Sequence, residues 1–267
     1  MFVYAQTTEI TVQSQVLNQE RKIWVSLPEN YAAGKGGCHL VILLDADNHS
    51  LFNLTVSAKR FLEGNSADAS DFQTPPAVIV GVGQSEDRSN DFGDSVRDLK
   101  FSDYLKTEII PYIKKKYRIT NYTILIGHSL AGEFAIKFFL NNPELVNAII
   151  AASPAIVERD IPQIIAKFDQ LLKPGALPGK RAIYFSTTYL QTDATESDFR
   201  KFSETLKKFL TDSKNPLFRF MFNSSKTLGH SKSPYFSIPE GLHFIYDPGL
   251  WQKQANSFID RKSNSDK

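Results

Sequence analysis

Residues 122–132 read Tyr-Thr-Ile-Leu-Ile-Gly-His-Ser-Leu-Ala-Gly, and this stretch decides the fold. Its first five residues form an apolar run that predicts a buried strand, and the apolar side chains of residues 134–139 predict a helix. Ser129 falls at the turn between them. Gly127 and Ala131, two residues before and two residues after it, are small enough for a very tight turn. The pattern predicts a nucleophile elbow, which lifts a serine hydroxyl above the edge of a sheet.

Short apolar runs recur on both sides of this motif and predict strands buried on both faces of a parallel sheet. They lie at residues 40–44, 77–82, 148–151, 182–185 and 217–222, with helical segments between them. Residues 9–17 and 22–27 instead alternate apolar and polar side chains, which predicts an antiparallel hairpin with residues 18–20 between its strands. We therefore expect an α/β fold, with a mostly parallel eight-stranded sheet, an N-terminal antiparallel hairpin and helices on both faces.

The length of 267 residues fits one such domain over residues 1–267. Residues 155–180 interrupt the alternation of strands and helices with one amphipathic helix and a Pro/Gly-rich tail. We interpret them as a small insertion that forms a lid over the site.

Composition excludes several classes of partner. The 31 basic and 29 acidic residues leave a net charge of +2, which provides no field to hold nucleic acid or an anionic membrane. No apolar run approaches the roughly 20 residues that span a bilayer. The single cysteine, Cys38, cannot form an internal disulfide. Val3 and Ala5 match the end of a signal peptide, but the preceding basic and apolar regions are missing, so the sequence leaves a cytoplasmic, periplasmic or secreted location open.

Chain order tests the elbow independently, because in this arrangement the acid and then the histidine follow the serine. Two of the five histidines follow Ser129. His243 lies in an amphipathic stretch that predicts a partly exposed helix residue. His230 lies in a loop after the last predicted strand, where a general base can reach the elbow. His128 is the neighbour of the serine and should point away from the substrate, so we interpret it as structural.

The acid should follow the strand at 182–185, where the chain offers Asp193, Glu196 and Asp198. Asp198 begins a predicted helix, where a carboxylate is common for reasons unrelated to catalysis, and Glu196 lies close to the same position. Asp193 lies in the loop proper and is our choice.

Two further polar segments have competing interpretations. Arg88 either holds an anionic group of the substrate or forms a structural ion pair, and the ion pair is favoured. His39, Asp45, Asp47 and His49 cannot form a metal site, because His39 lies at the opposite end of its strand from the others. We expect neither a metal nor a cofactor.

Several ordered blocks along nearly the whole chain carry a family resemblance. They are residues 20–31, 43–47, 80–82, 88–92, 108–113, 117–118, 153–154, 230–233 and 241–246, in addition to the elbow. Together they resemble the esterase D-like branch of the α/β-hydrolases, which includes ferric-enterobactin-type siderophore esterases, feruloyl esterases, S-formylglutathione hydrolases and mycobacterial mycolyltransferases. The resemblance implies an α/β-hydrolase fold and a serine carboxylic-ester hydrolase that acts on a small-molecule ester.

Residue by residue, the resemblance implies Ser129 as nucleophile, His230 as base and the amides of Asp47 and Leu130 as the oxyanion hole. Ala131 departs from the glycine that is usual there. The family often has a glutamate near the position of Gln191, so the acid is either displaced to Asp193 or absent, as in a Ser–His dyad. An acyltransferase or thioesterase on the same fold, or a ligand-binding module without turnover, remains an alternative function.

Overall fold

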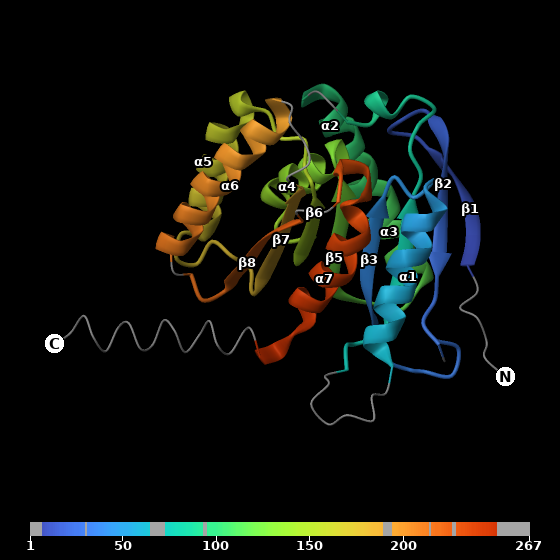
Figure 1. The fold of residues 1–267 in the computed structure, drawn as a ribbon. Helices are drawn as coiled ribbons and strands as arrows, with labels where there is room; N and C mark the ends of the chain where they lie inside the picture. The colour runs from blue at the N-terminus through green and yellow to red at the C-terminus, as the bar shows by residue number, and fades with distance from the viewer. Residues whose placement is uncertain are drawn as a thin grey trace.

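The computed structural model of the protein describes residues 7–29, 31–64, 73–92, 95–188, 194–213, 215–225 and 228–249 (Figure 1). Within these ranges, eight strands form one sheet in the order β1-β2-β4-β3-β5-β6-β7-β8. The strands are β1 (Thr7–Ser14), β2 (Gln19–Ser26), β3 (Cys38–Leu44), β4 (Ala77–Val82), β5 (Ile119–His128), β6 (Ala148–Ala152), β7 (Arg181–Thr188) and β8 (Phe218–Ser225). Strand β2 pairs antiparallel with β1 and β4, and the other pairs are parallel. The predicted fold class is confirmed.

Helices connect the strands. The α-helices are α1 (His49–Glu63), α2 (Ser95–Asp103), α3 (Ile110–Lys116), α4 (Leu130–Asn141), α5 (Ile161–Leu172), α6 (Ala194–Ser213) and α7 (Pro234–Tyr246). A π-helical segment, η2 (Tyr104–Ile109), joins α2 to α3. Three short 3₁₀ turns complete the described elements: η1 (Arg88–Asn90), η3 (Glu158–Asp160) and η4 (His230–Lys232).

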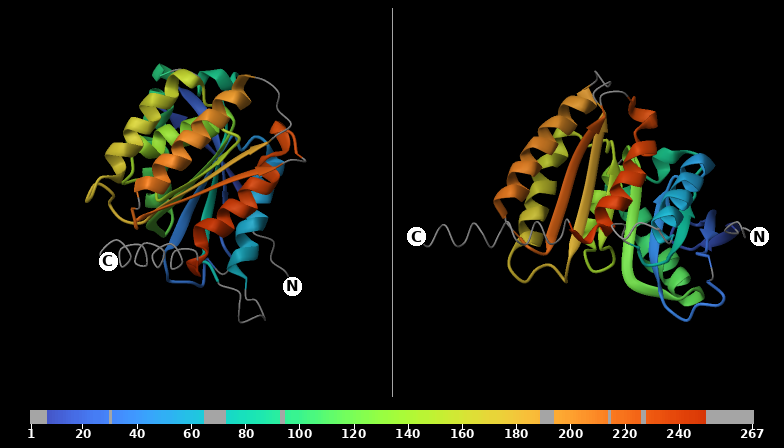
Figure 2. Two further views of the ribbon diagram at one scale, coloured as in Figure 1. Left: turned by 60° about the vertical axis from the view of Figure 1, so that its left-hand side comes forward. Right: turned by 60° about the horizontal axis from the view of Figure 1, so that its bottom comes forward.

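The sheet separates two helical layers (Figures 1 and 2). Helices α1 and α7 cover one face, where Val41 packs in the same cluster as Phe52 and Leu242. Helices α2 to α6 cover the other face, where Leu40 packs in a larger cluster with Phe134. Neighbouring residues of β3 thus face opposite layers, as the pleat of a strand requires. This double burial explains why the central strands are continuous apolar runs.

The N-terminal hairpin is present, but its turn lies at residues 15–18 rather than at residues 18–20. The Ser14 hydroxyl accepts a hydrogen bond from the Leu17 amide at 2.9 Å, and Asn18 adopts a positive φ of 53°. Glu108 also accepts hydrogen bonds from the amides of residues 15 and 16. This contact with η2 is tertiary, so the alternation of the two strands could not place the turn.

Helix α5 occupies much of the segment in which we expected a lid. Its side chains Ile164, Phe168, Leu171 and Leu172 are buried, and the helix packs against both α4 and α6. It is therefore part of the helical layer, and movement of residues 155–180 as a lid stays a prediction. None of the described helices is long and apolar enough to cross a membrane.

The carboxyl ends of the parallel strands meet at one edge of the sheet, where the chain makes three sharp turns. Asp45 after β3, Ser129 after β5 and Ser153 after β6 have φ values of 56°, 59° and 41°. Residues other than glycine rarely adopt positive φ, and such strain is often found at functional sites. This edge therefore holds the candidate site.

Candidate active site

Ser129 lies between the last residue of β5 and the first residue of α4, with φ 59° and ψ −122°. Backbone hydrogen bonds hold this strained conformation. The Ser129 amide donates to the carbonyl oxygen of Ala152 at 3.0 Å, and its own carbonyl oxygen accepts from the amides of Glu133 and Ala155, each at 3.0 Å. The turn is therefore fixed by β6, by the loop after it and by the first turn of α4.

The elbow requires small residues, as its sequence predicts. A Cβ atom at Gly127 would lie 2.1 Å from the carbonyl oxygen of Ala131, so glycine is obligatory there. Ala131 is fully buried. A Cβ atom at Gly132 would lie 3.2 Å from the Cα of Pro154, so the loop after β6 presses against the same turn.

Two backbone amides at this edge are candidates for an oxyanion hole. Leu130 is the first residue of α4, and amides in a first helical turn have no partner within the helix and lie at its positive end. Asp47 lies in the loop after β3, which pairs directly with β5. The Asp47 carboxylate accepts from the Gln84 amide at 2.6 Å, and the Asp47 carbonyl oxygen accepts from the His49 amide at 2.9 Å. The loop after β3 is thus held in place by hydrogen bonds at the carboxyl ends of the strands.

His230 begins the 3₁₀ turn η4, between β8 and α7. Its ring centroid lies 4.6 Å from that of His128, the residue before Ser129. The fold thus brings His230 to the elbow, although 102 residues separate it from His128. His243 instead lies on α7 with an exposed side chain, as we expected.

Two of the three acid candidates lie in helix α6. Asp193 lies outside the described residues, and so does Gln191. Helix α6 begins at Ala194 rather than at Asp198, so both Glu196 and Asp198 lie within it. The Asp198 carboxylate accepts a hydrogen bond from the Glu158 amide at 3.1 Å, which fastens it to η3.

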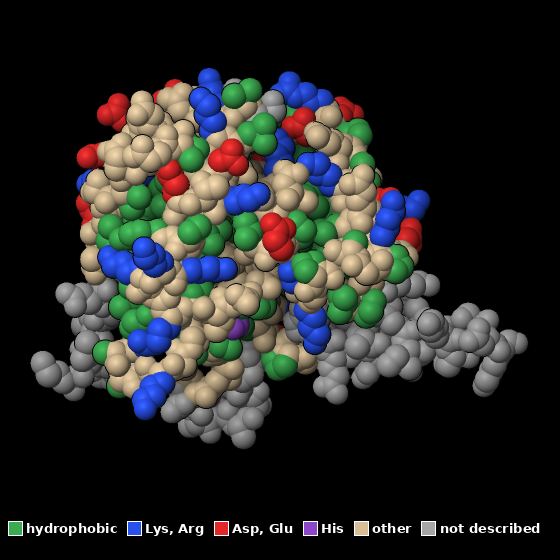
Figure 3. Space-filling model, turned by 180° about the vertical axis from the view of Figure 1, so that it is seen from behind, with side chains coloured by type: hydrophobic (Ala, Val, Ile, Leu, Met, Phe, Trp, Pro, Cys, Tyr) green, Lys and Arg blue, Asp and Glu red, His purple; other side chains and the backbone are tan. Residues whose placement is uncertain are grey.

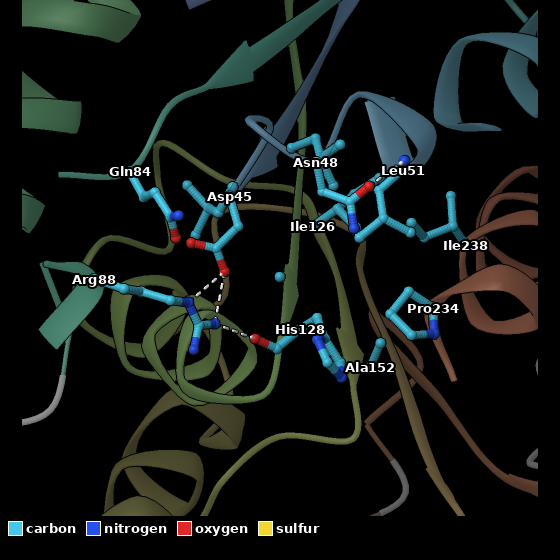
Figure 4. A pocket seen from close by; sticks show the side chains of 13 residues that line it. Asp45, Asn48, Leu51, Gln84, Arg88, Ile126, His128, Ala152, Pro234 and Ile238 are labelled. Atoms are coloured by element: carbon cyan, nitrogen blue, oxygen red, sulfur yellow. Dashed lines mark hydrogen bonds and ion pairs between the residues drawn. The ribbon is translucent and has the colours of Figure 1, made fainter. Parts of the chain in front are cut away.

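Arg88 forms the ion pair that the sequence favoured. Its Nε and Nη2 atoms donate to Oδ2 of Asp45 at 2.9 and 2.6 Å, and Nη2 also donates to the carbonyl oxygen of His128 at 2.9 Å (Figure 4). Burial raises the pKa of the Asp45 carboxyl, although Arg88 opposes the shift. A second ion pair, between Arg21 and Asp91, is fully buried and anchors the loop that carries Arg88.

Two hollows adjoin the elbow. A cavity of about 150 Å³ lies on the α1 and α7 side, and its lining includes Asp45, Arg88 and His128 (Figure 4). A groove of about 780 Å³ begins at Leu130 and runs along α4 between α2 and α5. It belongs to the helical layer seen from behind in Figure 3, where side chains of both charges are interspersed around the centre of the face. Among the described residues, no group of three or more His, Cys, Asp or Glu side chains could hold a metal ion.

Three features of the site escaped sequence analysis. The ion pair of Arg88 was expected, but its partner Asp45 was not, and neither was the contact of His128 with His230; both join residues far apart in the chain. The third is Lys137, which lies within 3.3 Å of carboxylate oxygens of Glu133, Asp98 and Asp160 in the groove. The spacing of Glu133 and Lys137, four residues apart on a predicted helix, was the signal available for it.

Comparisons with known proteins agree with the fold. The sequence model of a family described as "Putative esterase" matches residues 14–254. No match was found among curated proteins. Among solved structures, the fold is similar to an IroE-like serine hydrolase from Shewanella oneidensis, with 18% identity and a TM-score of 0.74 over 90% of this chain and 80% of that one. The BES protein from Bacillus cereus has 21% identity and a TM-score of 0.75, with 92% and 97% of the two chains covered.

The enterobactin esterase FES from Shigella flexneri is also similar, with 16% identity and a TM-score of 0.64. The match covers 93% of this chain but 59% of that one. Identities this low show a shared fold and assign no role to individual residues of the site.

Proposed function

The chain belongs to the Putative esterase family and is a carboxylic ester hydrolase, and we propose that it works as a serine hydrolase through an acyl-enzyme on Ser129. One observation carries this proposal. Ser129 sits at a strained turn between β5 and α4, and the fold brings a histidine from a distant loop to the same turn. A serine hydroxyl is a weak nucleophile unless an adjacent base activates it, and we assign that task to His230.

In the proposed reaction, His230 takes the proton of the Ser129 hydroxyl as its oxygen attacks the ester carbonyl. The amides of Leu130 and Asp47 donate to the oxyanion that forms. When the intermediate collapses, the bond to the alcohol oxygen breaks, and His230 gives its proton to the leaving alcohol. Water then attacks the acyl-enzyme, His230 takes its proton, and the free acid leaves as the Ser129 hydroxyl is restored.

We assign Asp193 as the acid that orients His230, on its position in the sequence between β7 and α6. Asp198 is less suitable, because its carboxylate is already bound to the backbone of η3. A Ser–His dyad is the arrangement that remains if no carboxylate fills this place.

The proposed substrate is a bulky small-molecule ester of the siderophore or feruloyl type. The groove of about 780 Å³ that begins at Leu130 has room for a large substituent beside the reacting carbonyl. Similar folds include a siderophore hydrolase from Aspergillus nidulans and a ferulic acid esterase, and the enterobactin esterase named above.

Labelling with a fluorophosphonate probe tests the nucleophile. We expect labelling of the parent protein and of Ser231→Ala, a matched control because Ser231 is an exposed serine beside His230. Ser129→Ala should not be labelled and should lose hydrolysis by several orders of magnitude, on the order of 10³-fold or more. Equal labelling of Ser129→Ala would overturn the proposal. A panel of a trilactone siderophore, a feruloyl ester and a simple acyl ester then ranks the substrates.

A further inference from the structure

His128 makes a specific contact with the backbone of the proposed base. Its Nε2 atom lies 3.0 Å from the carbonyl oxygen of His230, and the two rings are tilted by 43° at a centroid distance of 4.6 Å. A carbonyl oxygen only accepts hydrogen bonds, so the Nε2 atom of His128 carries the hydrogen and donates it. The contact fixes the tautomer of His128 as well as the position of the η4 backbone.

The surroundings of His128 favour this neutral donor. Burial lowers the pKa of His128 to about 4, and the charge of His230 contributes to the shift. The ring is therefore neutral around pH 7, with a single N–H group to donate. That group is already committed to His230, so His128 is not the proton carrier of the reaction.

The backbone of His128 is itself held in place by Arg88. Its carbonyl oxygen accepts from Nη2 of Arg88 at 2.9 Å, and Arg88 is bound to Asp45 at the end of β3 (Figure 4). A chain of contacts thus runs from β3, through the loop after β4 and the end of β5, to the turn that carries His230. Backbone atoms accept in two of its three links, so the chain fixes main-chain positions.

We propose that His128 is a positioning residue that holds the η4 turn so that the imidazole of His230 faces Ser129. The inference rests on the proposed function, in which His230 is the base. A base on a short loop needs such support, because a misplacement of about 1 Å can lower a rate on the order of 10²-fold. The elbow thereby supplies both the nucleophile and, from the adjacent residue, the support of its base.

A matched pair of amide variants tests the donor. The amide nitrogen of glutamine can occupy the place of Nε2, whereas the shorter asparagine cannot reach the His230 carbonyl. We expect His128→Asn to lower kcat and kcat/KM together, on the order of 10²-fold, with KM little changed, because the lost effect acts on the transition state. His128→Gln should restore most of this loss. Labelling by a fluorophosphonate should slow in parallel.

His39 provides the control. It too is an imidazole whose pKa burial lowers to about 4, and its Nδ1 atom lies 3.1 Å from the Tyr246 hydroxyl oxygen. It lies near the amino end of β3, however, at the opposite end of the strand from the site. His39→Gln should lower the melting temperature without changing kcat or KM. Melting temperatures of all variants separate loss of fold from loss of position.

Three results would overturn the inference: a His128→Asn variant as active as the parent, equal losses in His128→Asn and His128→Gln, or a rise in KM at unchanged kcat. If His128→Asn does not fold, a His128→Gln variant that folds but has lost its activity overturns it equally. Activity retained by Ser129→Ala, in contrast, would refute the proposed function rather than the role of His128.

Discussion

A Cβ atom at Gly127 would lie 2.1 Å from the carbonyl oxygen of Ala131, well inside the contact distance of the two atoms. The oxygen belongs to the backbone of α4, so it cannot move without moving the helix that follows Ser129. We therefore expect Gly127→Ala to lower the free energy of unfolding by about 1–3 kcal/mol or more, the usual cost of overpacking, and to abolish hydrolysis. Urea unfolding followed by circular dichroism measures the first effect.

Gly36→Ala is the matched control for that variant, because no atom would lie within 4 Å of its Cβ. It should change stability by less than about 1 kcal/mol in either direction. A Gly127→Ala protein with parental stability and activity would contradict the geometry of the elbow.

The buried ion pair of Arg21 and Asp91 holds the loop that carries Arg88, because Asp91 directly follows the turn η1. Its side chains are 1% exposed, and Asp91 also accepts from the Ser85 amide at 2.8 Å. Arg21→Met leaves the Asp91 carboxylate buried without its countercharge, so we expect a loss of about 3–5 kcal/mol in the free energy of unfolding. Urea unfolding measures it.

Two comparisons sharpen this prediction. Lys22→Met changes the next residue, whose ion pair with Glu9 is exposed, and should have no measurable effect. The double variant Arg21→Met with Asp91→Leu should recover part of the loss, because it leaves no unpaired charge. A double variant less stable than Arg21→Met would refute this account.

Replacing Arg88 distinguishes its two sequence-based interpretations. As the clamp between Asp45 and the His128 carbonyl, it acts on the elbow, so Arg88→Met should lower kcat on the order of tenfold, or about 1.4 kcal/mol, for neutral and anionic esters alike. Arg118 is an exposed arginine just before β5, at the opposite end of that strand from Ser129. Arg118→Met should leave kcat unchanged for both esters. A rise in KM confined to the anionic ester would show instead that Arg88 binds a substrate group.

The sequence was sufficient for the elements that depend on local pattern. Continuous apolar runs identified the central strands because both faces of the sheet are covered, and alternation identified the hairpin because β1 is half exposed. The turn of that hairpin was misplaced because Glu108, from η2, fixes it. The start of α6 was misplaced because residues 194–198 contain one alanine and four polar residues and carry no apolar periodicity.

For the candidate site, the sequence suffices to propose Ser129, because the tight turn restricts its neighbours, and His230, because chain order leaves few histidines. Pairings between distant residues could not be predicted in this way. His128 carries no local sign that its ring meets the His230 carbonyl, and Arg88 carries none that its partner is Asp45, 43 residues away. Such contacts depend on which loops meet at the edge of the sheet, and no periodicity encodes that.

The free energy of unfolding should depend on pH through Glu133, whose Oε1 atom lies 2.9 Å from Nζ of Lys137 on the same helix, α4. Burial raises the pKa of Glu133 from 4.5 to about 7, although Lys137 opposes the shift. Between these values the unfolded chain releases the proton while the folded protein keeps it, so this contribution to stability falls as pH rises through the window. Glu133→Gln removes the titration.

The measurable quantity is the difference in the free energy of unfolding between Glu133→Gln and the parent. It should shift in favour of the variant by roughly 2–3 kcal/mol from pH 4.5 to pH 7. Glu204→Gln, on the exposed face of α6, should show no such trend. A constant difference across the window would mean that Glu133 keeps its ordinary pKa.

The acid of the site can be identified with three isosteric variants. Asp193→Asn removes a charge but keeps a side chain that is equally favourable before a helix, so α6, which begins at Ala194, should be unaffected. We expect kcat/KM to fall by about 10²- to 10⁴-fold, because the imidazole of His230 loses the carboxylate that fixes its tautomer. Asp198→Asn should retain activity, since its carboxylate binds the Glu158 amide. If Asp193→Asn and Glu196→Gln both match the parent while His230→Ala is inactive, the enzyme works as a Ser–His dyad.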